Sequence, residues 1–260
     1  MTTSRALVPV GPVVEVLSKT CPDCGLTMIV PAQLGSVRFS RDLAVYCDDC
    51  AAHRHRAADR AERQSRLRNR FEDLLRRGHV GQELRRCAFR NSDPQVEALN
   101  PTAWAAVRRW RGKRNLYVYG PTGVGKSFLA RCCLNWSFQQ GLTVADVSGR
   151  RFAKVSDTFA EGRGLFNAWK EATVLLLDDI DKAVWNADRV GALWELLDTR
   201  ASARRHTLVT GNVSPAELLE LLHASNTGPG VRNDSIVDAT LERLRPCETL
   251  RLHGESLRER

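Results

Sequence analysis

Residues 120–127 read Gly-Pro-Thr-Gly-Val-Gly-Lys-Ser, a glycine-rich loop that ends in a lysine and a hydroxyl residue. An apolar run at residues 116–119 precedes this loop, and a helix-like run at residues 128–140 follows it. This strand–loop–helix order is the context in which a G-x-x-x-x-G-K-[ST] sequence binds phosphate groups. The glycines let backbone amides turn toward an anion, and the helix start presents its positive end to the same anion. The loop therefore predicts an α/β fold of the P-loop type.

The chemistry of the loop assigns a role to its last two residues. Lys126 is expected to contact the β- and γ-phosphates of a nucleoside triphosphate, and Ser127 to bind Mg²⁺. The residues expected to surround the nucleotide are Gly120, Pro121, Thr122, Gly123, Val124, Gly125, Lys126, Ser127 and Phe128. ATP and Mg²⁺ are therefore the predicted cofactors of this site.

An acidic pair, Asp178 and Asp179, directly follows four consecutive apolar residues at 174–177. Such a run is typical of a central parallel strand that is buried on both faces. Ligands of α/β sheets bind at the carboxyl ends of such strands. Asp178 is thus predicted to bind Mg²⁺, directly or through water, and Asp179 to polarise the attacking water.

Four of the eight cysteines form two C-x₂-C pairs, Cys21 with Cys24 and Cys47 with Cys50. Two such pairs can place four thiolates around a tetrahedral Zn²⁺, although the segment between them is slightly longer than usual. His53 and His55 lie close enough in the sequence to be alternative ligands. A region this small has too little core to fold alone, so a metal would stabilise it. A zinc-ribbon-like domain is predicted at residues 1–52.

The net charge of +9 is concentrated in residues 51–90, which hold twelve arginines and five acidic residues. From Ala51 to about Arg77 the chain lacks Gly and Pro, and its apolar residues recur at helical spacing. This pattern predicts a long, exposed, basic linker helix that ends at Gly78, assigned to residues 53–78. Its charge suits a nucleic-acid backbone, but a solvated helix face or a contact with an acidic protein is equally consistent with it.

Residues 79–260 are predicted to form one α/β domain with a doubly wound, parallel central sheet. Strands are expected at 142–147, 173–177, 207–210 and 248–252, and helices at 151–161, 165–171, 189–203, 215–223 and 238–245. The segment Asn91–Pro101, with two prolines, and the segment 226–233 are expected to be loops. Ser214 is expected to cap the helix that follows it.

No apolar run approaches the roughly 20 residues that a membrane helix needs. The N-terminus also lacks the basic start and apolar core of a secretory signal, so a cytoplasmic location is predicted. The remaining cysteines lack metal-ligand spacing and are expected to pack as small apolar residues; they are Cys87, Cys132, Cys133 and Cys247.

These motifs together resemble AAA+ ATPases of the DnaC/DnaI type, the bacterial and phage loaders of replicative helicases, within an IstB-like clade. The resemblance covers about half of the chain, from Asn115 to Arg245. The residues that carry it are the strand and loop 115–127, the acidic strand 175–179, the helix 193–200, the strand 207–212 and the segment 241–245. A cysteine-rich module ahead of the ATPase also resembles some loaders, where it contacts the helicase.

The resemblance implies further roles. Asn212 looks like the polar sensor that orients water or touches the γ-phosphate, although an Asn at a strand end is also a common turn residue. Arg243 looks like an arginine finger that acts in a neighbouring subunit's site, with Arg245 as the second candidate and a plain surface arginine as the alternative. Asp179 stands where many relatives have Glu, so slow, switch-like hydrolysis is expected. The segment after Leu252 leaves little room for a helical lid with a second sensor arginine.

The function implied is an ATP-dependent helicase loader that binds a replicative hexameric helicase and single-stranded DNA and self-associates through its ATPase domain. No membrane partner is expected. Two alternatives remain. One is a transposition-helper ATPase that binds double-stranded DNA. The other is a zinc-bearing adaptor that binds nucleotide only structurally.

Overall fold

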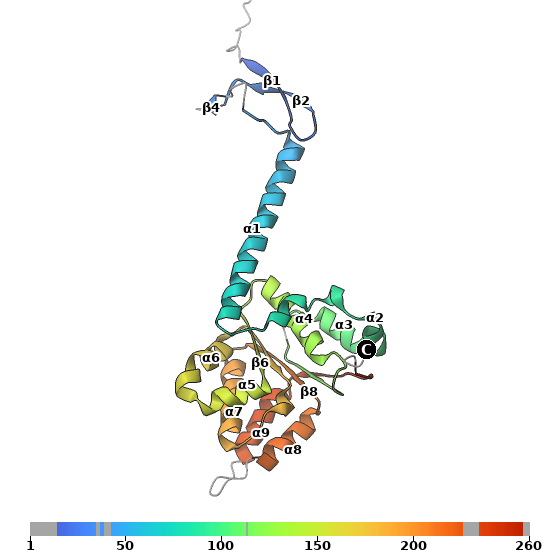
Figure 1. Ribbon diagram of the computed structural model, residues 1–260, viewed down its shortest axis with the longest axis vertical. Coiled ribbons are helices and arrows are strands. Elements are labelled where there is room, and N and C mark those ends of the chain that lie inside the picture. Colours follow the sequence, from blue (N-terminus) through green and yellow to red (C-terminus); the bar gives the residue numbers. More distant parts are fainter. Residues whose placement is uncertain (1–14, 35–36, 39–42, 113, 226–233, 257–260) are drawn as a thin grey trace, which may run out of the picture. The chain divides into compact units, whose positions relative to one another are not determined.

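The computed structural model describes residues 15–34, 37–38, 43–112, 114–225 and 234–256 (Figure 1). The chain divides into two compact units, Met1–Asn69 and Arg70–Arg260. The loop predicted at 226–233 lies outside the described residues. Within the described residues, no helix combines the length and the apolar character needed to cross a membrane.

The first unit contains two small antiparallel sheets. In one, β1 (Val16–Thr20) pairs with β2 (Thr27–Pro31), and the turn between them carries the first cysteine pair. In the other, β3 (Gln33–Leu34) pairs with β4 (Val37–Arg38). Within the described part of residues 15–69, the buried side chains are Lys19, Cys21 and Cys47. The described part of this unit therefore has no apolar core apart from its cysteines.

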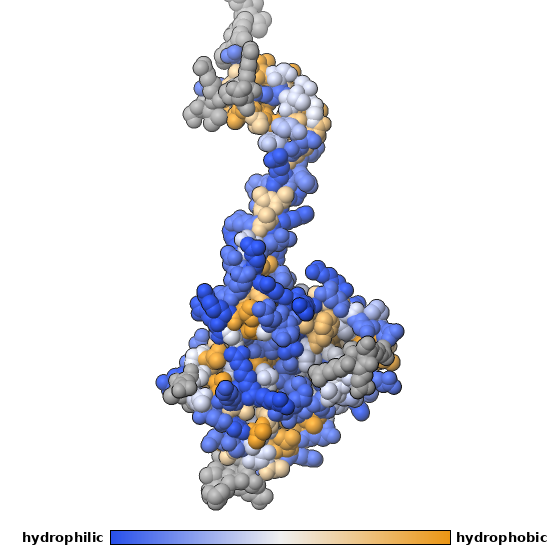
Figure 2. Space-filling view, viewed as in Figure 1, coloured by the Kyte–Doolittle hydropathy of each residue, from blue (hydrophilic) through white to orange (hydrophobic). Residues whose placement is uncertain are grey.

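A single helix, α1 (Asp48–Arg76), carries most of the basic stretch. It begins at Asp48 rather than at Ala51, because Asp48 and Asp49 place negative charge at the positive end of the helix. Every residue at positions 51–66 is exposed, and the surface of this segment is mostly hydrophilic (Figure 2). The last helical residue is Arg76, and the chain turns at Gly78, where the helix was predicted to end; the Gly78 and His79 amides donate to the carbonyls of Leu75 and Leu74. This pair of hydrogen bonds needs a residue in the left-handed conformation, and Gly78 has φ +69°.

The second unit is built on a five-stranded parallel sheet in the order β6-β7-β8-β5-β9. The strands are β5 (Leu116–Tyr119), β6 (Val144–Ser148), β7 (Val174–Asp178), β8 (His206–Gly211) and β9 (Glu248–Arg251). The register aligns Tyr119 with Gly211 and Ser148 with Asp178. The carboxyl ends of β5, β7 and β8 therefore meet at one edge, and the predicted parallel α/β fold is confirmed.

Helices cover both faces of this sheet (Figure 1). They are α2 (Pro94–Leu99), α3 (Pro101–Arg109), α4 (Lys126–Gln139), α5 (Gly149–Asp157), α6 (Phe159–Glu171), α7 (Ala187–Ser202), α8 (Pro215–Ser225) and α9 (Asp234–Leu244), with short 3₁₀ turns η1 (Gln82–Arg86), η2 (Phe89–Asn91) and η3 (Ile180–Lys182). Helix α4 packs against β7 and β8. Leu175 and Leu177 belong to the main core cluster, which includes residues of α5 to α9. Leu176 between them is equally buried, so β7 is covered on both faces as its apolar run predicts.

Two local predictions were wrong. The segment Asn91–Pro101 is not a loop throughout, because it contains α2. Asp93 caps this helix by accepting from the Gln95 amide, and Pro94 suits its first turn. Gly162 lies inside α6 rather than between two helices. A Cβ atom at Gly162 would lie 2.7 Å from Cγ1 of Val155, so the missing side chain lets α5 and α6 approach closely.

The predicted cap at Ser214 is confirmed. The Glu217 amide donates to Ser214 Oγ at 3.3 Å, and the Ser214 amide donates to Glu217 Oε2 at 2.7 Å. These reciprocal bonds form a capping box, which fixes the start of α8 directly after the β8 edge.

Candidate functional site

The glycine-rich loop connects β5 to α4 at the carboxyl edge of the sheet. Gly123 and Gly125 have φ angles of +86° and +92°, which side chains rarely adopt. A Cβ atom at Gly120 would lie 2.3 Å from the carbonyl oxygen of Leu252, so this position has no room for a side chain. The loop beside α4 opens onto a cavity of about 180 Å³. The residues that line it are Thr122, Gly123, Gly125, Lys126, Ser127, Phe128, Asp179, Lys182 and Asn212.

Lys126 is the first residue of α4, and its side chain is only 4% exposed. Its ammonium group donates to the Pro121 carbonyl at 2.6 Å and to Asn212 Oδ1 at 3.0 Å. Burial lowers the pKa of Lys126, and the nearby carboxylates of Asp179 and Asp181 partly offset that effect. A buried cation of this kind is stabilised when an anion enters the cavity.

Asn212 directly follows β8, and the structure places it beside Lys126. Its backbone amide donates to Asp181 Oδ1 at 2.9 Å, and its side-chain Nδ2 donates to Asp181 Oδ2 at 2.7 Å. Its Oδ1 accepts from Lys126 and, at 3.2 Å, from Thr122. Because a carboxylate only accepts and an ammonium only donates, these partners fix the orientation of the amide. The side-chain oxygen therefore faces the cavity, an arrangement that suits a hydrogen bond from water better than donation to a phosphate.

Asp178 is buried at the end of β7, and both of its carboxylate oxygens have protein partners. Thr210 Oγ1 donates to Oδ1 at 2.6 Å, and Arg131 of α4 donates to Oδ2 at 2.8 Å. Arg131 also donates to Asp146 Oδ2 at 2.8 Å, and burial raises the pKa of Asp146. Each carboxylate oxygen of Asp178 keeps a second lone pair, which can accept from water. With a guanidinium this close, Asp178 is suited to hold Mg²⁺ through a water molecule, while Ser127 lines the cavity and can bind the ion directly.

Asp179 reaches the cavity from a left-handed backbone position. Its φ is +53°, and its amide donates to Thr210 Oγ1 at 2.9 Å, so Thr210 holds both members of the acidic pair. The Asp179 carboxylate accepts from Lys182 Nζ at 2.5 Å. The structure therefore brings Asp179, Asn212 and Lys126 to one cavity, as a site that polarises water beside a phosphate requires.

Four residues of this site were not predicted from the sequence: Arg131, Asp181, Lys182 and Thr210. Asp181 and Lys182 directly follow the acidic pair, and their charge could have drawn attention to them. Arg131 gives no such signal, because it contacts Asp178, a residue 47 positions further along the chain and in another element.

Arg243, the predicted trans-acting arginine, lies in the last turn of α9. Its guanidinium donates twice to Asp198 Oδ1, at 2.9 and 2.6 Å, and its side chain is 45% exposed. Arg245 pairs with Glu242 at 2.7 Å. Neither arginine lines the cavity of its own chain. The position of Arg243 on an exposed helix end leaves a role toward a neighbouring subunit as a prediction.

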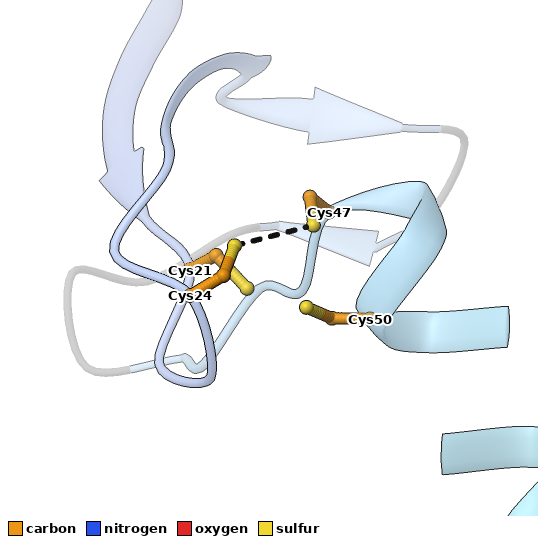
Figure 3. A group of neighbouring side chains, drawn as sticks. All are labelled: Cys21, Cys24, Cys47 and Cys50. Carbon is orange, nitrogen blue, oxygen red and sulfur yellow. Dashed lines mark hydrogen bonds between the residues drawn. The ribbon is translucent and has the colours of Figure 1, made fainter. Parts of the chain in front are cut away.

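The two cysteine pairs converge in the first unit (Figure 3). The four Sγ atoms of Cys21, Cys24, Cys47 and Cys50 all lie within 4.8 Å of one another, and those of Cys24 and Cys47 are 3.6 Å apart. Four thiolates about 2.3 Å from a tetrahedral Zn²⁺ would be separated by about 3.8 Å, so the cluster fits this ion. The first pair lies in the turn between β1 and β2, and the second pair surrounds the start of α1.

Electrostatics around the cluster also suit a metal. A hydrogen bond from the Cys47 backbone lowers the pKa of Cys21 to about 6, so this sulfur is a thiolate at neutral pH. Hydrogen bonding with Cys47 raises the pKa of Cys50, as expected where thiols crowd one another. His55 pairs instead with Asp59 on the exposed face of α1. The four cysteines are therefore the better ligand set.

The other four cysteines are buried in the second unit. Burial raises the pKa of Cys87 to about 11 and that of Cys247 to about 12. It also raises the pKa values of Cys132 and Cys133. These thiols pack as apolar side chains, as predicted from their spacing.

Comparison with known proteins finds a family match within the second unit. Residues 116–225 match the ATPase family associated with various cellular activities (AAA). No curated protein matches the sequence.

Several solved structures share the fold. DnaA from Aquifex aeolicus bound to AMPPCP has a TM-score of 0.52 at 17% identity, over 68% of this chain and 52% of that chain. A putative primosome component from Streptococcus pyogenes serotype M3 has a TM-score of 0.50 at 23% identity, over 68% and 91%. A DnaC helicase loader has a TM-score of 0.50 at 15% identity, over 66% and 100%. The matched part of this chain thus spans about half of the DnaA chain but nearly all of the other two.

The P-loop, the acidic pair and Asn212 all lie within the segment that matches the AAA family, and they meet at one cavity. The chain therefore contains an AAA ATPase domain.

Proposed function

We propose that this protein is an ATP-dependent loader that binds a replicative hexameric helicase and deposits it on single-stranded DNA. The observation that carries the proposal is the combination of an AAA nucleotide site with a separate four-cysteine module and an exposed basic helix. ATP and Mg²⁺ would occupy the cavity beside Lys126, and Zn²⁺ would occupy the cysteine cluster. The fold match to a helicase loader over that protein's whole length agrees with this assignment.

The cysteine module offers an apolar surface suited to a protein partner. In the β1–β2 sheet, Ser18 lies opposite Ile29 and Val16 lies opposite Pro31, so these residues share one face. Ile29 is 77% exposed and Val16 is 56% exposed. An unusually exposed apolar pair on so small a module favours contact with another protein over contact with nucleic acid. We assign helicase binding to this face.

The basic helix offers the complementary surface for DNA. Arg56, Arg60 and Arg68 of α1 are exposed, and the helix belongs to the most basic part of the chain. Arginines of this kind bind phosphate groups and release counterions, so the affinity for single-stranded DNA should fall steeply with salt. ATP-driven assembly of several subunits would line up several such helices and raise that affinity.

The function is tested by mixing the protein with hexameric helicase and the non-hydrolysable analogue AMPPCP. We expect a stable complex by size-exclusion chromatography and electron microscopy. We expect Ile29→Glu to weaken it at least about tenfold, because a charge would replace a buried apolar contact. Val184→Glu, which changes another exposed apolar residue in the second unit, is the matched control and should bind normally. Absence of any complex with the native protein, together with binding to double-stranded DNA and a transposase, would favour the transposition-helper alternative.

Self-association through the ATPase domain is tested at Arg243. We expect Arg243→Ala to lower ATP turnover by about 10³-fold, the usual effect of losing an arginine finger. Mixing this variant with Lys126→Ala subunits should restore part of the turnover, because the latter still supply Arg243 to a neighbouring site. The pair with Asp198 is no obstacle, since both side chains are substantially exposed and such pairs are weak.

Arg245→Ala is the control and should keep most of the activity. If mixing restores nothing, Arg243 acts only within its own subunit, through Asp198.

A further inference from the structure

The nucleotide cavity contains a second lysine. Lys182 lines the same cavity as Lys126, Ser127 and Asn212. Its Nζ lies 2.5 Å from Asp179 Oδ2, and the two side chains are 32% and 26% exposed. Lys182 is therefore neither a remote surface residue nor a buried core residue. It is a partly desolvated cation at the site where ATP is expected to bind.

The backbone explains why Lys182 faces the cavity. Asp179 occupies a left-handed position whose amide is held by Thr210, and the 3₁₀ turn Ile180–Lys182 follows directly. The Lys182 amide donates to the Asp179 carbonyl at 3.0 Å, which closes the turn. Residues three apart in such a turn lie on the same side, so both side chains point toward the loop. The backbone conformation of residues 179–182 therefore directs the Lys182 side chain toward the cavity.

Charge in the cavity favours a polyanion. Burial lowers the pKa of Lys126, and the positive charge of Lys182 lowers it further, so the two ammonium groups repel each other. In the free protein, Asp179 neutralises Lys182, and the acceptors of Lys126 among the described residues are two neutral oxygens, at 2.6 and 3.0 Å. A triphosphate entering the cavity would stabilise both cations at once.

The position of Lys182 selects which phosphate it meets. The loop amides and Lys126 hold the phosphates nearest the start of α4. Lys182 lies instead beside Asp179, the residue placed to polarise water next to the terminal phosphate. A diphosphate would end before this point, whereas the γ-phosphate of a triphosphate would reach it.

We propose that the Lys182 ammonium contacts the γ-phosphate of ATP bound in its own subunit. When ATP binds, this ammonium stops donating to Asp179 and donates to a γ-phosphate oxygen instead. Lys182 then discriminates ATP from ADP, and its departure frees an Asp179 oxygen to accept from water. The Asp179 carboxylate would be available only when a γ-phosphate is present. This inference rests on nucleotide binding in the AAA cavity and is independent of helicase loading.

The test compares Lys182→Met with the native protein by calorimetric titration with AMPPCP and with ADP, both in excess Mg²⁺. We expect the affinity for AMPPCP to fall about tenfold, the loss of one charge-assisted hydrogen bond, and the affinity for ADP to change less than about twofold. Lys182→Arg should restore the preference for AMPPCP because it keeps the charge. Lys154→Met removes an exposed lysine of α5 and should leave both affinities unchanged.

A second variant protects the test against misfolding. Asp179→Asn removes the partner of Lys182 and should keep or strengthen AMPPCP binding, because Lys182 is then free for phosphate. Unchanged AMPPCP affinity in Lys182→Met would overturn the proposal, even if ATP turnover rose, because Lys182 would then only restrain Asp179. Equal losses for AMPPCP and ADP would overturn it as well. If neither nucleotide binds the native protein, the failure lies in the nucleotide site itself.

Discussion

Replacement of Lys126 by alanine is expected to weaken the binding of Mg·ATP at least about 100-fold while the ATPase domain stays folded. Lys126 is 4% exposed and lies at the start of α4, where backbone amides also face the cavity. Two charge-assisted hydrogen bonds to phosphate, at about 1.5–3 kcal/mol each, account for a loss of this size. Calorimetric titration with AMPPCP measures it directly.

Thermal unfolding provides the control for this experiment. The substitution also removes hydrogen bonds to Pro121 and Asn212, so a modest fall in Tm is expected. Binding within threefold of the native protein would contradict the assignment of the cavity as the ATP site. A variant that binds no ATP but retains full biological activity would favour the adaptor alternative over the loader.

Replacement of Cys47 by serine is expected to abolish zinc binding and to unfold the cysteine module. In the described part of residues 15–69, the buried side chains are two cysteines and one lysine, so a bound metal would take the place of an apolar core. Structural zinc contributes about 10–16 kcal/mol to the folding of comparable small modules. Zinc content by elemental analysis and amide dispersion by NMR report the two effects separately.

The ATPase domain gives an internal control. Its nucleotide affinity and its Tm should be unchanged in Cys47→Ser, because all four cysteines of the cluster belong to Met1–Asn69. Cys87→Ala, which alters a buried cysteine of that domain, should retain one zinc per chain. A native protein that contains no zinc and keeps a folded module in EDTA would show that the cluster is not a zinc site.

The fold was largely predictable because its strongest signals are local. Four apolar residues before Asp178 indicate a strand covered on both faces, and the glycine-rich loop fixes a strand before it and a helix after it. Helix α2 was missed because the two prolines of the segment Asn91–Pro101 suggested a loop, although Asp93 and Pro94 together are also a helix start. Gly162 was misplaced because the closeness of α5 to α6, which requires a glycine, is a tertiary contact.

The candidate site was predictable only in part, for the same reason. Lys126, Asp179 and Asn212 come from recognisable positions, and the structure brings them to one cavity. The contact of Arg131 with Asp178 depends on how α4 lies across β7, which no local pattern reveals. The orientation of the Asn212 amide depends on its contacts with both Asp181 and Lys126, so it could be determined only from the structure.

The unequal burial of the eight cysteines has a chemical consequence. The four in the ATPase domain are shielded, and burial keeps them as neutral thiols. In the cysteine module, Cys24 is exposed and Cys50 is partly exposed, whereas Cys21 and Cys47 are buried. Peroxide and alkylating reagents should therefore attack Cys24 and Cys50 of the metal-free module first and leave the ATP-hydrolysing machinery intact, so oxidation would disrupt the module before it stopped turnover.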